Sequence, residues 1–418
     1  MSQRYDVAIV GAGAAGLAAA QALDGRGLRI VVLEASARIG GRAHSIFPTE
    51  LGGAMFDRGA SWLHAAERNP LVPIARAAGI ALRQSDADAA WRLRVGEREA
   101  TTAEHACHER AEAHYSKLVE AALADGGDLA MADAVAEMSD DPWLGSVETF
   151  ACRLIAAADP RRLSARDWRD NELDGANLLP EGGVGGVVVR CLGRDVRLAT
   201  PVSGIEWGED GVALRTAAGA VSARAAIVTV STGVLRSLTW VPELPTAQRE
   251  ALDALPMGLL TKVAIADPRG AGFGLAAGGG MSGQVTPRHA PSMSFLADPR
   301  GGHVVGFVGG DTAEALSRDG ISATAAFAVE RLRALLGGSV RVAETVVADW
   351  LVDPWSRGAY AYARVGHASA RRILGEAWGG GRIVYAGEAV ATDGLAGTVG
   401  GAYASGVAAA QTVLAALA

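Results

Sequence analysis

Residues 5–34 read YDVAIVGAGAAGLAAAQALDGRGLRIVVLE, and this stretch decides the fold. An apolar run leads into Gly11, Gly13 and Gly16 in Gly-x-Gly-x-x-Gly spacing, and a helix-prone segment follows. In such a unit the first glycine permits a tight turn, the second lets a pyrophosphate approach the backbone, and the third lets helix and strand pack closely. A second apolar run ends on Glu34, whose carboxylate can accept hydrogen bonds from both ribose hydroxyls. The stretch therefore predicts a dinucleotide site with phosphates at the helix N-terminus.

Two more glycines and an arginine, Gly40, Gly41 and Arg42, follow the acidic residue after a short gap. The Arg42 guanidinium can donate two charge-assisted hydrogen bonds to a phosphate, which predicts a second contact with the pyrophosphate. This extension resembles the FAD-binding start of the flavin amine oxidase superfamily, which also contains protoporphyrinogen oxidases and carotenoid desaturases.

The composition disfavours several classes of function. The chain has 418 residues, 50% of them hydrophobic, so it exceeds one ordinary domain and can bury a large core. Its net charge of −7 and the lack of a Lys/Arg cluster disfavour nucleic acid as a partner. Cys107, Cys152 and Cys191 show no metal-ligand spacing, so we expect no metal site. No uncharged apolar run reaches ~18 residues, apart from the Gly/Ala-rich C-terminal stretch, which is better suited to a buried core helix. We therefore expect no transmembrane segment, no signal peptide and a cytoplasmic location.

The order of apolar runs predicts an α/β chain with two domains. We expect a discontinuous, Rossmann-like FAD-binding domain from residues 1–75, 180–255 and 380–418, and a mixed α/β substrate domain from a helical stretch, 76–179, and a sheet with a helix, 256–379. Expected strands lie at 5–10, 29–33, 196–198, 202–207, 212–216, 225–230, 261–266 and 382–387. Expected helices lie at 17–23, 187–192, 246–255, 323–336 and 400–418, and helical structure is expected over 103–159.

Five further motifs, in order along the chain, resemble those of flavin-containing amine oxidases. They are Phe56–His64 (FDRGASWLH), Asn177–Leu192 with its Pro-Glu-Gly-Gly, Ala226–Leu235 (AIVTVSTGVL), Trp350–Tyr360 (WLVDPWSRGAY), and Val384–Glu388 (VYAGE) with Gly397–Gly406 (GTVGGAYASG). The resemblance covers nearly the whole chain and implies the amine oxidase fold, a Rossmann-like FAD domain joined to a mixed α/β substrate domain.

The fingerprint and the resemblance together imply a set of FAD-binding residues. Glu388 follows a buried strand and could accept hydrogen bonds from flavin hydroxyls, although a helix cap or a surface glutamate would show the same pattern. Thr398 and Val399 begin the last helix, whose dipole would stabilise negative charge on a reduced flavin. Val202 matches the family position beside the adenine. The full set is Gly11, Gly13, Ala14, Ala15, Gly16, Glu34, Ala35, Gly41, Arg42, Gly59, Ala60, Ser61, Val202, Trp350, Gly387, Glu388, Thr398 and Val399.

Lys262 is the sharpest catalytic candidate. It lies in an apolar strand, LTKVAIA, where a buried cation is costly without a partner. The resemblance implies that this lysine binds a water beside flavin N5. The alternative is an edge-strand lysine that extends its ammonium to solvent.

Tyr360 matches one wall of the aromatic cage that orients the amine over the flavin, and Thr398 stands where monoamine oxidases carry the other wall. Tyr362 or Trp355 could supply ring surface instead, although each is more often a packing residue. Ala359 occupies the position of the flavin-tethering cysteine of monoamine oxidases, so non-covalent FAD is expected.

His64, which follows Trp62 in the FDRGASWLH motif, matches a substrate-contacting histidine of animal polyamine oxidases. A structural hydrogen-bonding role is the alternative for this histidine. The acidic balance of the chain, with His64, Glu67 and Glu181, favours a distal ammonium and therefore a di- or polyamine. Trp62, His64 and Glu181 are the expected substrate-binding residues.

The resemblance implies an FAD-dependent amine oxidase with a small amine and molecular oxygen as partners. Hydride transfer from the neutral amine to flavin N5 would give an imine, which water hydrolyses, and oxygen would reoxidise the flavin to give hydrogen peroxide. One alternative is a desaturase or porphyrinogen-type oxidase of an apolar substrate. The other is a flavin-binding protein without turnover.

Overall fold

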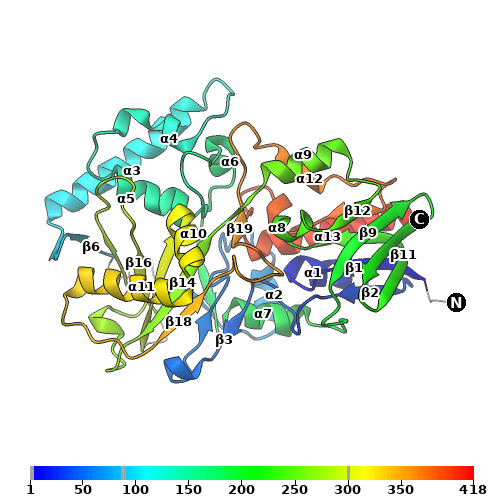
Figure 1. Ribbon diagram of the computed structural model, residues 1–418, viewed down its shortest axis with the longest axis horizontal. Coiled ribbons are helices and arrows are strands. Elements are labelled where there is room, and N and C mark those ends of the chain that lie inside the picture. Colours follow the sequence, from blue (N-terminus) through cyan, green and yellow to red (C-terminus); the bar gives the residue numbers. More distant parts are fainter. Residues whose placement is uncertain (1–3, 86–90, 299–301) are drawn as a thin grey trace.

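The computed structural model describes residues 4–85, 91–298 and 302–418. Two seven-stranded sheets lie in opposite halves of the molecule, and the helix-rich stretch α3–α6 covers one end (Figure 1). Both chain ends lie in the half that holds β1 and α13 (Figure 1).

The first sheet is built around β1 (Tyr5–Val10). Its order is β12 (Thr239–Val241), β9 (Val202–Gly208), β10 (Gly211–Thr216), β11 (Gly219–Val228), β1 and β2 (Ile30–Leu33), and β20 (Ile383–Tyr385) pairs with β11. β1 is parallel to both β2 and β11, whereas β9, β10 and β11 form an antiparallel meander. Parallel central strands are buried on both faces, which explains why β1 and β2 are nearly continuous apolar runs.

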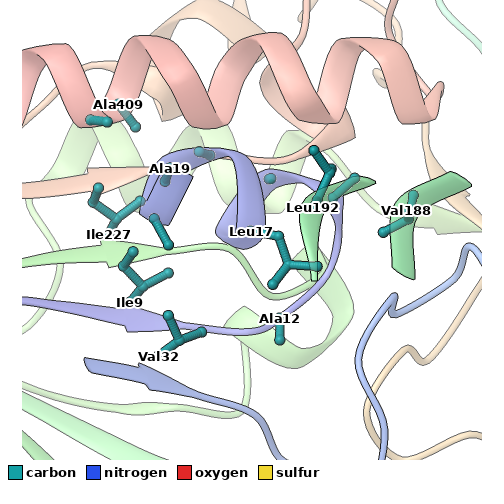
Figure 2. Close-up of a cluster of buried hydrophobic side chains, with 14 of the residues drawn as sticks. Ile9, Ala12, Leu17, Ala19, Val32, Val188, Leu192, Ile227 and Ala409 are labelled. Atoms are coloured by element: carbon teal, nitrogen blue, oxygen red, sulfur yellow. The ribbon is translucent and has the colours of Figure 1, made fainter. Parts of the chain in front are cut away.

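Three helices cover one face of this sheet. They are α1 (Ala14–Ala22), α7 (Gly183–Leu192) and α13 (Val399–Leu417), and their side chains share one core with the strands (Figure 2). α13 approaches α1 closely because both helices carry small residues at the contact. A Cβ on Gly406 of α13 would lie 2.1 Å from the carbonyl oxygen of Ala15 in α1. Glycine is therefore required there by the helix–helix distance.

The second sheet has the order β18 (Thr345–Ala348), β14 (Leu260–Ala266), β17 (His303–Gly309), β16 (Ser294–Ala297), β15 (Gly280–Gly283), β6 (Trp91–Val95) and β7 (Arg98–Glu99). Helices α10 (Gly310–Asp319) and α11 (Ile321–Leu336) pack on one face, over a core that contains Val263, Ile265 and Phe295. Residues alternate along a strand, so Lys262 and Leu260 of β14 point to the opposite face. That face borders the cavity described below.

The helical stretch begins at α3 (Thr102–Ala122), which starts with a capping box between Thr101 and Glu104. It continues through α4 (Met131–Ala134), α5 (Leu144–Glu148), the π-helical η3 (Thr149–Leu154) and α6 (Ala165–Asp170). The remaining elements are short: β3 (Ser45–Ile46), η1 (Thr49–Leu51), β4 (Phe56–Asp57), α2 (Leu71–Ala77), β5 (Leu82–Gln84), η2 (Ala136–Met138), β8 (Leu178–Pro180), α8 (Thr232–Leu235), α9 (Thr246–Ala254), β13 (Met257–Gly258), η4 (Gly272–Gly274), β19 (Tyr360–Ala361), α12 (Ala370–Gly375) and η5 (Glu388–Val390).

These elements confirm the expected strands and helices, with one exception and several shifted ends. The expected strand at 196–198 is wrong, because only Arg197 forms a bridge, with Leu33 at the end of β2. The chain turns away at Ala199, whose φ is +48°, before a ladder can form. The strand expected at 225–230 begins at Gly219, and the first helix begins at Ala14. Among the described residues no helix is long and apolar enough to cross a membrane, and no cluster of His, Cys, Asp and Glu could hold a metal ion.

Close packing of α13 on α1 predicts that Gly406→Ala destabilises the fold. The added methyl group would collide with the Ala15 carbonyl, and overpacking of this kind costs about 1–3 kcal/mol. Gly186→Ala in α7 is the matched control, because a Cβ at Gly186 would meet nothing within 4 Å. This substitution should stabilise the helix by about 0.5–1 kcal/mol, since alanine loses less backbone entropy than glycine. Urea unfolding of both variants measures the difference. Equal midpoints for the two variants would contradict the packing argument.

Candidate active site

A cavity of about 860 Å³ runs from the glycine-rich turn of the first sheet to the inner face of the second sheet. Its lining includes Gly11 and Glu34 at one end, Lys262 and Tyr360 in the middle, and Phe150 and Trp168 from the helical stretch. The cavity therefore joins the expected nucleotide site to the expected catalytic residues.

The nucleotide end has the shape that a dinucleotide requires. Gly13 is the N-cap of α1, and a Cβ at this position would meet nothing within 4 Å, so the open space lies directly over the helix N-terminus. The Glu34 carboxylate accepts hydrogen bonds from the N–H groups of Ala12, at 2.7 Å, and Ser36, at 2.9 Å, which holds the glycine turn against the end of β2. Free helix N–H groups beside an acidic residue fit a pyrophosphate and a ribose. The residues present at this end therefore fit FAD.

Most of the expected cofactor residues line this one cavity. Gly16 is the exception, because it packs between helix and strand, where a Cβ would lie 2.0 Å from the Gly11 carbonyl oxygen. That is the packing role that the fingerprint assigns to its third glycine. The lining members are Gly11, Gly13, Ala14, Ala15, Glu34, Ala35, Gly41, Arg42, Gly59, Ala60, Ser61, Val202, Trp350, Gly387, Glu388, Thr398 and Val399.

Arg42 has protein partners that the sequence did not indicate. Its Nη1 donates to the Ala359 carbonyl at 2.7 Å and to the Glu388 carboxylate at 2.9 Å. The Glu388 carboxylate also accepts the N–H of Ala361, at 3.2 Å. Arg42 therefore serves as a bridge between two distant segments, and only its remaining N–H groups are left for the expected contact with a phosphate.

Lys262 is buried, and its side chain faces the FDRGASWLH segment. Its Nζ donates to the carbonyls of Gly59 and Asp57 and, at 2.7 Å, to the hydroxyl of Ser61. The same Nζ lies 5.6 Å from the ring centre of Trp62 and 5.5 Å from that of Phe307. The alternative of a lysine reaching solvent is wrong, because Lys262 is only 5% exposed.

The electrostatics of this region favour neutral groups. Burial lowers the pKa of the Lys262 ammonium to about 8, while the charge of Asp57 opposes that shift. Burial also lowers the pKa of His64, and the Lys262 charge lowers it further, while the hydrogen bond that His64 donates to the Asn177 side-chain oxygen raises it. A second positive charge beside Lys262 would be costly, and an uncharged amine would be accepted more readily.

Tyr360 and Thr398 both line the cavity. The Tyr360 hydroxyl donates to the Leu154 carbonyl at 2.6 Å, which fixes the ring between the helical stretch and Gly397. Thr398 is the N-cap of α13, and its hydroxyl accepts from the Gly401 N–H at 3.0 Å. The Thr398 hydroxyl is therefore bound to the helix end. Tyr362, another candidate for ring surface, also lines the cavity.

The structure brings together only part of the expected substrate-binding set. Trp62 and His64 line the cavity, and the His64 Nδ1 lies 2.7 Å from the Asn177 side-chain oxygen. Glu181 is exposed and is not part of the lining, and its backbone N–H pairs with the Ala81 carbonyl at the end of the two-stranded β5–β8 sheet. Glu67 is also exposed, and its carboxylate accepts the N–H of Ala176. Glu67 and Glu181 therefore do not converge with His64, and the expected substrate-binding role of Glu181 is wrong.

A buried ion pair at the cavity wall was missed by the sequence reasoning. The Arg371 guanidinium donates to both oxygens of Asp167, at 2.7 and 2.8 Å, and also to the Ala361 carbonyl at 3.0 Å. Asp167 in turn accepts the N–H of Ala363 at 3.1 Å. The two charged residues are 204 positions apart, so no local pattern indicates that they meet.

Comparisons with known proteins agree with this geometry. The family described as flavin containing amine oxidoreductase matches residues 14–414. Lysine-specific histone demethylase 1 homolog 1 of Arabidopsis thaliana is 30% identical over 98% of this chain, which spans only 52% of that protein. Polyamine oxidase 4 of Oryza sativa subsp. japonica is 28% identical over 97% of this chain and 88% of its own length. The chain belongs to the flavin-containing amine oxidoreductase family, whose members act on amine groups.

Solved structures show the same fold. A double mutant of putrescine oxidase superposes with a TM-score of 0.82 at 21% identity, over 99% of both chains. Cyclohexylamine oxidase from Brevibacterium oxydans IH-35A superposes with a TM-score of 0.80 at 22% identity, over 98% of this chain and 99% of its own. The expected fold, a mixed α/β structure of the amine oxidase type, is confirmed.

The low pKa of Lys262 predicts a specific dependence of stability on pH. The folded protein releases this proton near pH 8, whereas the unfolded chain keeps it to about 10.5, so the unfolded state binds more protons between these values. The free energy of unfolding of the wild type, relative to Lys262→Met, should therefore rise by about 3 kcal/mol from pH 8 to 10.5. Urea unfolding of both proteins across this range measures the difference. A difference that stays constant with pH would contradict the burial of the cation.

Proposed function

We propose that this chain is an FAD-dependent amine oxidase that oxidises a primary or secondary amine to an imine. The carrying observation is that one cavity holds the dinucleotide end, the buried Lys262 and the ring of Tyr360. We propose further that the first sheet, from residues 1–75, 180–255 and 380–418, is the core of the FAD-binding domain. Residues 76–179 and 256–379 would form the substrate domain.

Bound FAD would accept a hydride from the carbon next to the amine nitrogen. The protein would supply orientation and a dry, electrostatically suitable site. Tyr360 presents its ring to the substrate, and its hydroxyl, held by Leu154, prevents rotation of the side chain away from the cavity. With a pKa of about 8 Lys262 is still charged at neutral pH, so it disfavours a second ammonium nearby and favours the neutral amine that can release a hydride. The lowered pKa of His64 leaves this side chain uncharged.

Lys262 is the proposed catalytic residue that acts beside the cofactor. Three protein acceptors surround its Nζ, of which the Ser61 hydroxyl can rotate and the two carbonyls cannot. A water held by Lys262 would therefore replace or share the Ser61 contact. Imine hydrolysis, molecular oxygen as the acceptor and hydrogen peroxide as a product stay predictions, as does a cytoplasmic location.

The residues beside the cage support non-covalent binding. Ala359 lines the cavity and has no nucleophilic atom, so a thioether to the flavin cannot form at this position. The FAD should therefore leave the protein completely on acid or heat denaturation. A desaturase of an apolar substrate and a flavin protein without turnover remain the alternative functions, and the experiments below separate them from an amine oxidase.

Glu34→Gln should weaken FAD binding by about tenfold. The carboxylate is replaced by an amide with one acceptor oxygen, and a charge-assisted hydrogen bond contributes about 1.5–3 kcal/mol. Titration of the apoprotein with FAD, followed by flavin fluorescence, measures the dissociation constant. Glu67→Gln is the matched control, since this glutamate is exposed and does not line the cavity. Equal affinities for the two variants would show that Glu34 does not contact the cofactor.

Lys262→Met should retain FAD and slow the oxidase cycle by roughly 100-fold, because a positioned proton donor or acceptor is lost. Stopped-flow measurements should time flavin reduction by amine and reoxidation by oxygen separately. Lys117→Met is the control, because Lys117 is exposed on α3. Wild-type rates in both half-reactions would remove Lys262 from the mechanism. No flavin reduction by any amine would overturn the proposed function itself.

A further inference from the structure

The part of the cavity beyond Tyr360 has two walls that are largely apolar. One wall is the inner face of the second sheet, where Lys262, Phe307 and Ser294 stand opposite one another on β14, β17 and β16. Leu296 lines the cavity from the same face. The Lys262 ammonium is turned toward the Asp57–Ser61 segment, so the sheet offers mainly ring and aliphatic surface to a substrate.

The opposite wall comes from the helical stretch. Its lining residues are mostly apolar and include Phe150, Ala151, Leu154, Ile155, Leu163 and Trp168. Phe150 is 52% exposed and Ile155 is 42% exposed, although both belong to the cavity lining. Large apolar side chains left open inside a cavity gain free energy when an apolar ligand covers them.

Six carboxylates line the cavity among the residues that the structure describes, and the buried ones already have partners. Glu34 accepts the backbone N–H groups of Ala12 and Ser36, and the half-buried Asp353 accepts that of Trp355. Asp167 is bound by Arg371, and Glu388 is bound by Arg42. Glu112 on α3 and Glu172 after α6 line the cavity too, but both are exposed. An ammonium held near the apolar walls would therefore lack a desolvated counter-charge and would be repelled by Lys262.

We infer, on the basis of the proposed function, that the substrate is a monoamine with an apolar body, such as an aryl, cycloalkyl or long alkyl amine. The distal part of this substrate covers Phe150 and Ile155, and its single nitrogen lies beside Tyr360. A di- or polyamine is excluded by the cost of placing its second ammonium against these walls.

Two amines of equal length test this inference on the FAD-bound protein. Heptylamine and 1,6-diaminohexane differ only in a terminal methyl group against a terminal ammonium. Anaerobic flavin reduction should give a second-order rate constant at least about tenfold higher for heptylamine, because the diamine loses apolar contact and must desolvate a charge. Cyclohexylamine and phenethylamine should also exceed putrescine and spermidine. A faster rate with 1,6-diaminohexane or spermidine would overturn the inference and leave the amine oxidase function intact, whereas failure of every amine would overturn the function.

Substitutions at Phe150 test whether this side chain is responsible for the preference for heptylamine over 1,6-diaminohexane. Phe150→Glu should shift the heptylamine to diaminohexane ratio toward the diamine by about tenfold or more, because it places a carboxylate on the apolar wall. Phe150→Ala should lower the rate for heptylamine more than that for propylamine, since only the longer amine reaches this wall. Ile321→Ala is the control, because this exposed side chain lies on α11 and does not line the cavity. An unchanged ratio in Phe150→Glu would contradict the placement of the substrate.

The exposed acids provide the last arm of the test. Glu112→Gln and Glu172→Gln should leave the monoamine to diamine ratio unchanged, because the apolar walls determine it. A ratio that rises in either variant, because the rate for the diamine drops, would show that a surface carboxylate binds a distal ammonium, and would overturn the inference.

Discussion

The Glu388 carboxylate makes the contact on which the geometry of the site depends. It is 6% exposed and binds the Arg42 guanidinium and the N–H of Ala361. Arg42 also holds the carbonyl of Ala359, so both sides of Tyr360 are tied to one ion pair. Removal of one partner would leave a buried charge without compensation, which typically costs about 3–5 kcal/mol. The pair therefore fixes the ring of Tyr360 with respect to the glycine turn and the last strand.

A second ion pair completes this arrangement from the other side. Arg371 and Asp167 bind the carbonyl of Ala361 and the N–H of Ala363. The short segment that carries Tyr360 is therefore held by residues from the N-terminal part, the helical stretch and the C-terminal part of the chain. Lys262 joins the same network, because its Nζ binds the Gly59 carbonyl and a Cβ at Gly59 would overlap the Arg42 carbonyl. Lys262 and the ring of Tyr360 thus share one rigid frame, as the role proposed for them requires, because rigid placement of reacting groups is a large part of catalysis.

Local elements of this fold could be predicted from the sequence, whereas the long-range contacts that hold the site could not. The strands and helices around the glycine turn were predictable, because each carries a local pattern that its own residues set. The prediction of a strand at 196–198 failed, because three residues of apolar or extended type do not determine whether they reach the edge of a sheet. Arg371 and Asp167 could not be predicted, since two residues of common type meet only through the tertiary fold. The prediction for Glu181 failed for the converse reason, because this residue lies within a recognised motif but faces solvent at the end of the two-stranded β5–β8 sheet.

The motifs that reveal the family do not include the apolar side chains that are proposed to cover the distal part of the substrate. The recognised motifs surround the nucleotide end and the segment of Tyr360, whereas Phe150, Ile155 and Trp168 belong to a helical stretch without a recognised motif. A shared fold therefore carries little information about which amine is bound. Two constraints within this chain carry more. The charge of Lys262 in the cavity disfavours a second charged nitrogen, and the open apolar side chains beyond Tyr360 favour an apolar body. An amine with one nitrogen satisfies both constraints, whereas a polyamine satisfies neither.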